Sequence, residues 1–162
     1  MVKGFSRVQI GLHWAVAALI LFNLLVENDL GNLLRQAAQG GMPTTTTVAW
    51  AHIIMGSLVL ALVVWRLALR FTRGVPAAPE GEGRMLKLAG GAGHAALYLL
   101  MIALPVAGLL GWFGDISLLA DLHGEMLKVL LWLVIITHVL AALYHQIVLK
   151  DGLLNRMRRP VD

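Results

Sequence analysis

Four long apolar segments, separated by shorter polar ones, dominate this chain of 162 residues. They cover approximately residues 8–26, 48–71, 91–113 and 123–149, and none has Asp, Glu, Lys or Arg near its centre. A helix needs roughly 20 residues to cross the hydrocarbon core of a bilayer. Because lipid offers the backbone no hydrogen-bond partner, each segment is predicted to be a transmembrane helix. The pattern therefore predicts an all-α, four-helix transmembrane bundle that forms a single domain over residues 1–162.

The polar segments are expected to be connections at the two membrane surfaces. The connection over residues 72–90 is rich in Pro and Gly and is predicted to be a flexible linker, with a short interfacial turn at residues 85–88. The threonines at 44–47 supply hydroxyl groups that are expected to cap the second helix. The first apolar run follows Lys3 and Arg7, as in a signal peptide, but no Ala-x-Ala-like site ends it. We therefore expect this run to be a retained span.

The composition agrees with a membrane protein and excludes several kinds of chemistry. Hydrophobic residues make up 59% of the chain and charged residues only 14%, whereas soluble domains carry about 25% charged residues. There is no cysteine, which excludes disulfides, thiolate catalysis, iron–sulfur clusters and covalent haem attachment. The net charge of +4 does not indicate nucleic-acid binding, because the basic residues flank the apolar segments instead of forming one basic face.

The distribution of Lys and Arg predicts the orientation of the bundle. An even number of spans places both termini on one side, and that side holds 11 of the 13 basic residues. Only Arg35 and Lys128 lie on the other side, together with five acidic residues, which gives that side a net charge of −3. Because cytoplasmic loops carry the excess of Lys and Arg, both termini are expected to be cytoplasmic. The end of the bundle that holds both termini is called the inner end below, and the opposite end the outer end.

The histidines are the most informative polar residues. An ionisable residue at membrane depth is costly and indicates function by default. A single histidine there could equally be a buried residue bonded to a neighbouring carbonyl group, but that explanation is poor for a whole set. All six lie within the apolar runs or at their ends: His13, His52, His94, His123, His138 and His145.

Depth in the membrane divides these histidines into two levels. His52 and His123 open the second and fourth helices, so they share an outer level. At about 1.5 Å per residue, His138 lies roughly 22 Å deeper than His123. His13 lies near the cytoplasmic end of the first helix and is expected to share the inner level with His138. Helical steps of about 100° place His123, His138 and His145 broadly on one side of the fourth helix.

Two histidines from different helices at one level suit a haem iron with two imidazole ligands. Gly11, Gly56 and Gly124 are close to these histidines in the sequence and would leave room for a flat macrocycle or, equally, for tight helix packing. A zinc site would need three or four ligands, usually including a carboxylate or thiolate, and the inner level offers no carboxylate. A proton relay would normally include an intramembrane Asp or Glu.

Several motifs carry a family resemblance that runs nearly from end to end of the chain. They are SRVQIGLHW at 6–14, AHIIMG at 51–56, WRL at 65–67, HAALY at 94–98, ALPVAG at 103–108, HVLAALYH at 138–145 and LKDGLL at 149–154. On these motifs the chain resembles the bacterial cytochrome b561 family of four-helix dihaem membrane proteins. The resemblance implies two haem b groups. The family pattern places the outer haem between His52 and His123. It places the inner haem between His13 and His138, with the imidazoles bound to iron.

His94 and His145 match two further family histidines near the cytoplasmic face that are not expected to be axial ligands. In a related superoxide oxidase, the position matching His145 is tied to the quinone site, so His94 and His145 are candidates for a quinone site here. The resemblance also implies a multi-pass protein of the bacterial inner membrane. The segment over residues 114–122 is shorter than in that superoxide oxidase. The negative outer side would also repel an anionic donor at long range.

The function expected from these residues is electron transfer between a donor on the outer side, with superoxide as one candidate, and quinone in the membrane. The protein would then be an oxidoreductase of the superoxide:quinone type or an electron carrier. The expected partners are the lipid bilayer, quinone and a small-molecule or protein donor, without nucleic acid. One alternative is a membrane-anchor subunit that relays electrons for a dehydrogenase or hydrogenase. A second is a haem-free transporter or proton path.

Overall fold

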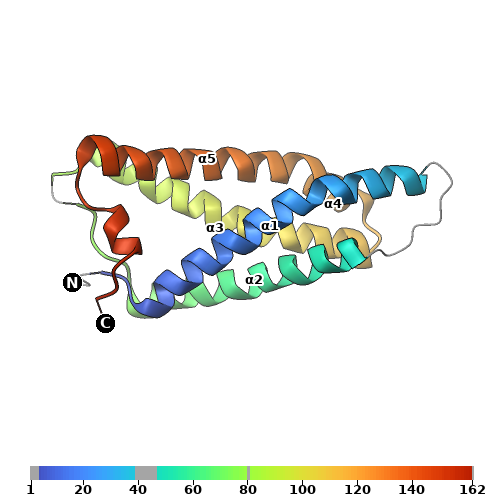
Figure 1. Cartoon of the computed structure of the whole chain (residues 1–162), viewed down its shortest axis with the longest axis horizontal. Helices are drawn as coiled ribbons and strands as arrows, with labels where there is room; N and C mark the ends of the chain where they lie inside the picture. Colours follow the sequence, from blue (N-terminus) through green and yellow to red (C-terminus); the bar gives the residue numbers. More distant parts are fainter. Residues whose placement is uncertain (1–3, 39–46, 80, 162) are drawn as a thin grey trace.

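The computed structural model describes residues 4–38, 47–79 and 81–161, and within these ranges it contains helices and connecting segments but no strand. Figure 1 shows long helices running side by side along the molecule. Three of them are α1 (Arg7–Ala38), α2 (Thr47–Arg73) and α3 (Arg84–Phe113). The fourth consists of α4 (Ser117–Asp121), the π-helical η1 (Leu122–Leu127), α5 (Lys128–Tyr144) and the π-helical η2 (His145–Leu149). A short 3-10 helix, η3 (Leu154–Met157), follows in the C-terminal segment.

The four helices are long and apolar enough to cross a membrane, over Arg7–Leu25, Thr47–Arg73, Arg84–Phe113 and Ser117–Leu149. This confirms the predicted all-α architecture with four spans. Many large apolar side chains face outwards, more than a water-soluble protein exposes. Phe71 is 80% exposed and Leu99 is 69% exposed. In a bilayer the lipid tails solvate such side chains, so the outward apolar surface is what a transmembrane bundle requires.

The core that holds the helices together is thin and entirely apolar. It draws on all four helices and therefore fixes their mutual positions by close packing. Its buried members are Val16, Ile20, Val59, Val63, Leu100, Met101 and Leu131.

Several helix ends differ from those predicted. The first helix continues to Ala38, and the third begins at Arg84, so the predicted turn at residues 85–88 is wrong. These residues lie in the first turns of α3, and of the predicted linker the described residues 74–79 and 81–83 remain outside the helices. The fourth helix begins at Ser117. Polar residues at the membrane surface can continue a helix, so the end of an apolar run does not fix its boundary. Thr47 is the first residue of α2, and residues 44–46 of the predicted cap lie outside the described ranges.

The C-terminal segment folds back over one end of the bundle. Lys150 has a positive φ of 51°, which turns the chain after the last span. The indole Nε1–H of Trp14 donates to the carbonyl oxygen of Met157 at 2.9 Å. The backbone N–H of Val161 donates to the carbonyl oxygen of Phe5 at 3.3 Å. Both described chain ends therefore lie at the same end of the bundle, as Figure 1 also shows.

Candidate functional site

The outer histidine pair is brought together across the bundle. His52 lies near the start of α2 and His123 lies in η1, and their ring centroids are 5.8 Å apart with an interplanar angle of 87°. Both line a cavity whose remaining wall is mostly apolar. Two polar side chains also line this cavity, Asn23 from α1 and Lys128 from α5. From the sequence, Lys128 was expected only as a charge of the outer surface.

The ring of His123 is held in one orientation by α3. Its Nδ1 atom lies 2.8 Å from the carbonyl oxygen of Leu104. Because a carbonyl oxygen only accepts, Nδ1 carries the proton and Nε2 keeps its lone pair. Gly108 permits this approach, since a Cβ atom there would lie 2.9 Å from Nδ1 and Cε1 of the ring. The arrangement leaves Nε2 available to bind a metal.

The inner pair is also brought together, from α1 and α5. The ring centroids of His13 and His138 are 6.3 Å apart with an interplanar angle of 57°. The Nδ1 atom of His13 is buried and has no hydrogen-bond partner within the described part of the chain. A buried polar atom of this kind calls for an explanation.

A third imidazole lies at the inner level. The ring of His94, from α3, packs edge-on against His138 with 5.4 Å between the centroids. Its Nδ1–H donates to the carbonyl oxygen of Gly90, one turn earlier, at 2.7 Å. The inner level therefore contains His13, His94 and His138, of which the sequence analysis had expected two.

Positive charge lies beside the inner pair. The guanidinium carbons of Arg66 and Arg70, one turn apart on α2, lie 5.9 and 6.0 Å from the ring centroid of Tyr98 on α3. Stacking on an aromatic face favours a cation. Arg66 is half-buried and close enough to His13 and His138 to interact electrostatically with both. It is placed to neutralise an acidic group of a molecule bound at this level.

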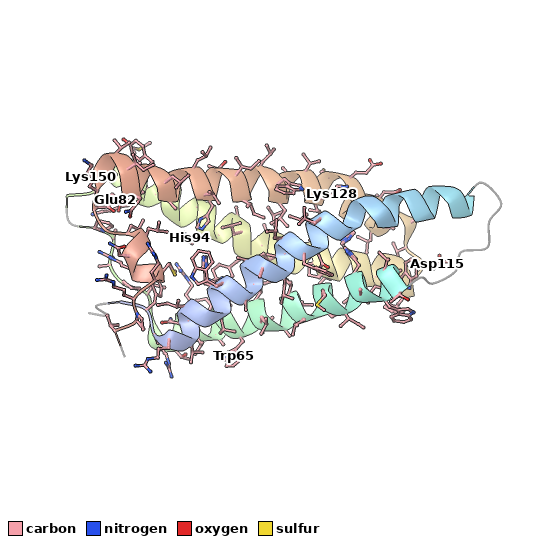
Figure 2. All side chains as sticks on the ribbon, viewed as in Figure 1. Trp65, Glu82, His94, Asp115, Lys128 and Lys150 are labelled. Carbon is pink, nitrogen blue, oxygen red and sulfur yellow. The ribbon has the colours of Figure 1, made fainter. Side chains whose placement is uncertain are left out.

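His145 lies in a separate cluster at the inner end of the bundle. Its side chain is 9% exposed, and its Nδ1 atom lies 2.5 Å from Oδ2 of Asp151. Its Nε2 atom lies 3.8 Å from Oε1 of Glu82, which belongs to the connection between α2 and α3. Figure 2 labels Glu82 at this end of the molecule, near Lys150. An imidazole between two carboxylates can hold and exchange a proton.

Asp151 is anchored on both of its oxygen atoms. The backbone N–H of Leu153 donates to Oδ1 at 3.0 Å, while Oδ2 contacts His145. Burial alone would raise the pKa of Asp151, but the hydrogen bonds from His145 and Leu153 outweigh it and hold the pKa below its ordinary value of 3.8. Asp151 and Glu82 were not predicted as site residues, because neither lies within an apolar run. The polar turn directly after the last span is the feature of the sequence that could have indicated Asp151.

Comparisons with known proteins agree with the resemblance seen in the motifs. The family described as prokaryotic cytochrome b561 matches residues 4–160. Cytochrome b562 from Cereibacter sphaeroides is 36% identical over 157 residues, covering 97% of this chain and 96% of that protein. A probable superoxide oxidase, CybB, from Yersinia pestis is 28% identical and covers 97% of both chains. Cytochrome b561 homolog 2 from Escherichia coli (strain K12) is 32% identical over 65% of this chain and 68% of that protein.

Proposed function

Because this chain belongs to the prokaryotic cytochrome b561 family, and is therefore a multi-pass inner-membrane electron-transfer protein with haem b, we propose that it holds two haems and passes electrons between an outer-side donor and membrane quinone. The observation that carries this proposal is the pair of histidine contacts from different helices, with ring centroids 5.8 and 6.3 Å apart. When bound, haem supplies a one-electron carrier at each level.

The outer level fits a haem in its donor set and surroundings. His52 and His123 are the proposed iron ligands, and the cavity that both line is mostly apolar. The Oδ1 atom of Asn23, in the same wall, is buried and without a hydrogen-bond partner in the described part of the chain. The carbonyl of Leu104 holds His123 in the tautomer that a metal ligand needs.

The inner level fits a second haem. His13 and His138 are the proposed iron ligands, and the closeness of their rings, which come from α1 and α5, supports this pair. Arg66 and Arg70 are proposed to neutralise the carboxylates of the cofactor. An electron received at the outer pair is proposed to pass to the inner pair, and from there to quinone near His94 and His145.

The donor is proposed to approach from the outer side, and superoxide is one candidate. The probable superoxide oxidase from Yersinia pestis supports this candidate, although it is only 28% identical. Reduction of the haems by enzymatically generated superoxide, with superoxide dismutase as the control that abolishes it, tests this donor. A slow reaction that accelerates with salt would reveal the repulsion expected from the negative outer side.

The ligand assignment is tested by single substitutions. His13→Ala and His138→Ala are each expected to remove the inner haem, and His52→Ala and His123→Ala the outer one, because each change deletes an iron ligand. Difference spectra of the reduced and oxidised protein and the haem-to-protein ratio measure the loss. His94→Ala is the matched control, since its ring also packs on His138 but is not a proposed ligand.

Loss of the inner haem in His94→Ala, together with its retention in His13→Ala, would show that the inner ligands are misassigned. If the purified wild-type protein showed no b-type absorption bands, the proposal of haem-based electron transfer would be disproved.

A further inference from the structure

The cluster of Glu82, His145 and Asp151 (the inner carboxylate–imidazole cluster below) joins three elements at the inner end of the bundle. Its members come from the connection between α2 and α3, from η2 and from the segment after Lys150. Two contacts hold it together, 2.5 Å from His145 Nδ1 to Asp151 and 3.8 Å from Nε2 to Glu82. Ionisable groups rarely stay buried together unless their charges interact.

The two carboxylates stand in different relations to the ring. Asp151 is within hydrogen-bond distance of Nδ1 and is fixed by the N–H of Leu153, so it orients the imidazole and favours its charged form. Glu82 is too far from Nε2 for a direct hydrogen bond, but close enough to stabilise a positive charge on the ring. Nε2 is thus the ring nitrogen that is left to give up and regain a proton.

The surroundings of the cluster connect it to the solution at the inner end. The side chain of Glu82 is 9% exposed, and the glycines on either side of it, Gly81 and Gly83, are exposed. The other titratable or charged neighbours that the contacts show are the ring of Tyr144, 6.3 Å from His145, and Arg156, which interacts electrostatically with Asp151. Arg156 also ties the C-terminal segment to the α2–α3 connection through the carbonyl of Ala77 at 2.6 Å.

We propose that the inner carboxylate–imidazole cluster is a proton-exchange site that supplies protons for the reduction of quinone. The inference rests on the proposed function, in which quinone is the electron acceptor. Reduction of one quinone to quinol consumes two electrons, delivered one at a time from the inner pair, and two protons. Each proton leaves Nε2 of His145 for a quinone oxygen, and a proton from the solution replaces it through the carboxylate of Glu82.

The experiment uses the complete haem-loaded protein, reduced beforehand with dithionite that is then removed. It is mixed with a short-chain benzoquinone, and haem re-oxidation is followed between about pH 5 and pH 8, where imidazole titrates. Glu82→Gln is the decisive variant, because Glu82 makes no direct hydrogen bond to the ring and its loss preserves the shape of the site. Asp151→Asn is the second variant. Asp115→Asn, at an exposed residue of the α3–α4 connection, is the matched control.

Both variants are expected to keep two haems and normal haem reduction. They are expected to re-oxidise more slowly with quinone, by up to about 100-fold, because His145, which both variants retain, is re-protonated less readily. The dependence of the rate on pH should also differ from that of the wild type, because the ring has lost a neighbouring anion. Asp115→Asn should behave as wild type. Glu82→Gln with the wild-type rate and pH profile would overturn the inference and leave quinone reduction standing. A wild-type protein that transfers no electrons to quinone would overturn both.

Discussion

Hydrogen bonds to single ring nitrogens decide what each histidine can do. His123 and His94 both donate Nδ1–H to a backbone carbonyl group, which leaves Nε2 free in each. His145 differs, because a carboxylate occupies Nδ1 and a second one lies near Nε2. The same residue type therefore serves as a metal ligand at one depth and as a proton carrier at another, in the roles proposed above. The contact at Nδ1 thus differs between His123, a proposed iron ligand, and His145, the proposed proton carrier.

Gly108 is a positioning residue for His123. We expect Gly108→Ala to displace the ring, because the new Cβ atom would lie 2.9 Å from two ring atoms. Disturbing the support of a metal ligand weakens binding by about 10-fold or more, so the outer haem should be lost or its redox potential changed. Redox titration and haem content measure the effect. Gly93→Ala is the control, since a Cβ atom there meets nothing within 4 Å. An unchanged outer haem in Gly108→Ala would show that the ring has room to move.

Two of the helical elements depart from regular α geometry where the histidines lie. His123 lies within the π-helical η1 and His145 opens the π-helical η2. π-Helical turns are rare and are often found at functional sites. The expectation that His123, His138 and His145 lie broadly on one side of the fourth helix assumed a regular α-helix, so the pairing seen here depends on the wider turns as well. Lys150 then adopts a left-handed conformation that ends the helix and returns the chain.

The docking of the C-terminal segment should depend on pH through Asp151. Because the pKa of Asp151 is held below 3.8 in the folded protein, its contribution to docking is complete above the unfolded-state pKa. It is lost as the pH falls through the folded-state pKa. At neutral pH, Asp151→Asn should speed hydrogen exchange in residues 150–161 by about 5- to 30-fold, which corresponds to about 1–2 kcal/mol.

Hydrogen–deuterium exchange measured by mass spectrometry over these residues provides the test. The difference between Asp151→Asn and wild type should disappear at a pH below 3.8. The same substitution at the exposed Asp115 should leave exchange in the C-terminal segment unchanged. Equal exchange in wild type and Asp151→Asn at neutral pH would mean that the contacts of Trp14 and Arg156 hold the segment without Asp151.

At the scale of the whole molecule, several arginines lie together at one end of the bundle. Arg70 and Arg73 lie in the last turn of α2, where cations also complement the helix dipole, and Arg84 begins α3 at the same end. The described chain ends meet there too, through the bond from Val161 to Phe5. This basic end is the one that we expect to face the cytoplasm.

Reporter fusions test that orientation. A fluorescent protein fused to the C-terminus is expected to fluoresce, and alkaline phosphatase at the same position to be inactive, because both would remain in the cytoplasm. Alkaline phosphatase inserted into the α3–α4 connection, residues 114–116, is expected to be active. The opposite pattern would show that the bundle has the inverse orientation. The proposed outer and inner haems would then lie on the opposite sides of the membrane from those expected.

The sequence by itself determined the four spans and the depth of each histidine, because hydrophobicity and helical rise are local properties of the chain. The pairing of His13 with His138 and of His52 with His123 followed from depth alone, and the structure brings both pairs together. Helix ends were less predictable, since polar residues such as Arg84 and Met85 continue α3 beyond its apolar run.

Only the tertiary structure decided which groups surround each histidine. Glu82 and Asp151 reach His145 because two connections outside the spans fold over the inner end of the bundle. The carbonyl of Leu104 reaches His123 because Gly108 lets the two helices approach. Such contacts join residues that are far apart in the sequence and depend on the packing of several elements at once, so no local pattern encodes them.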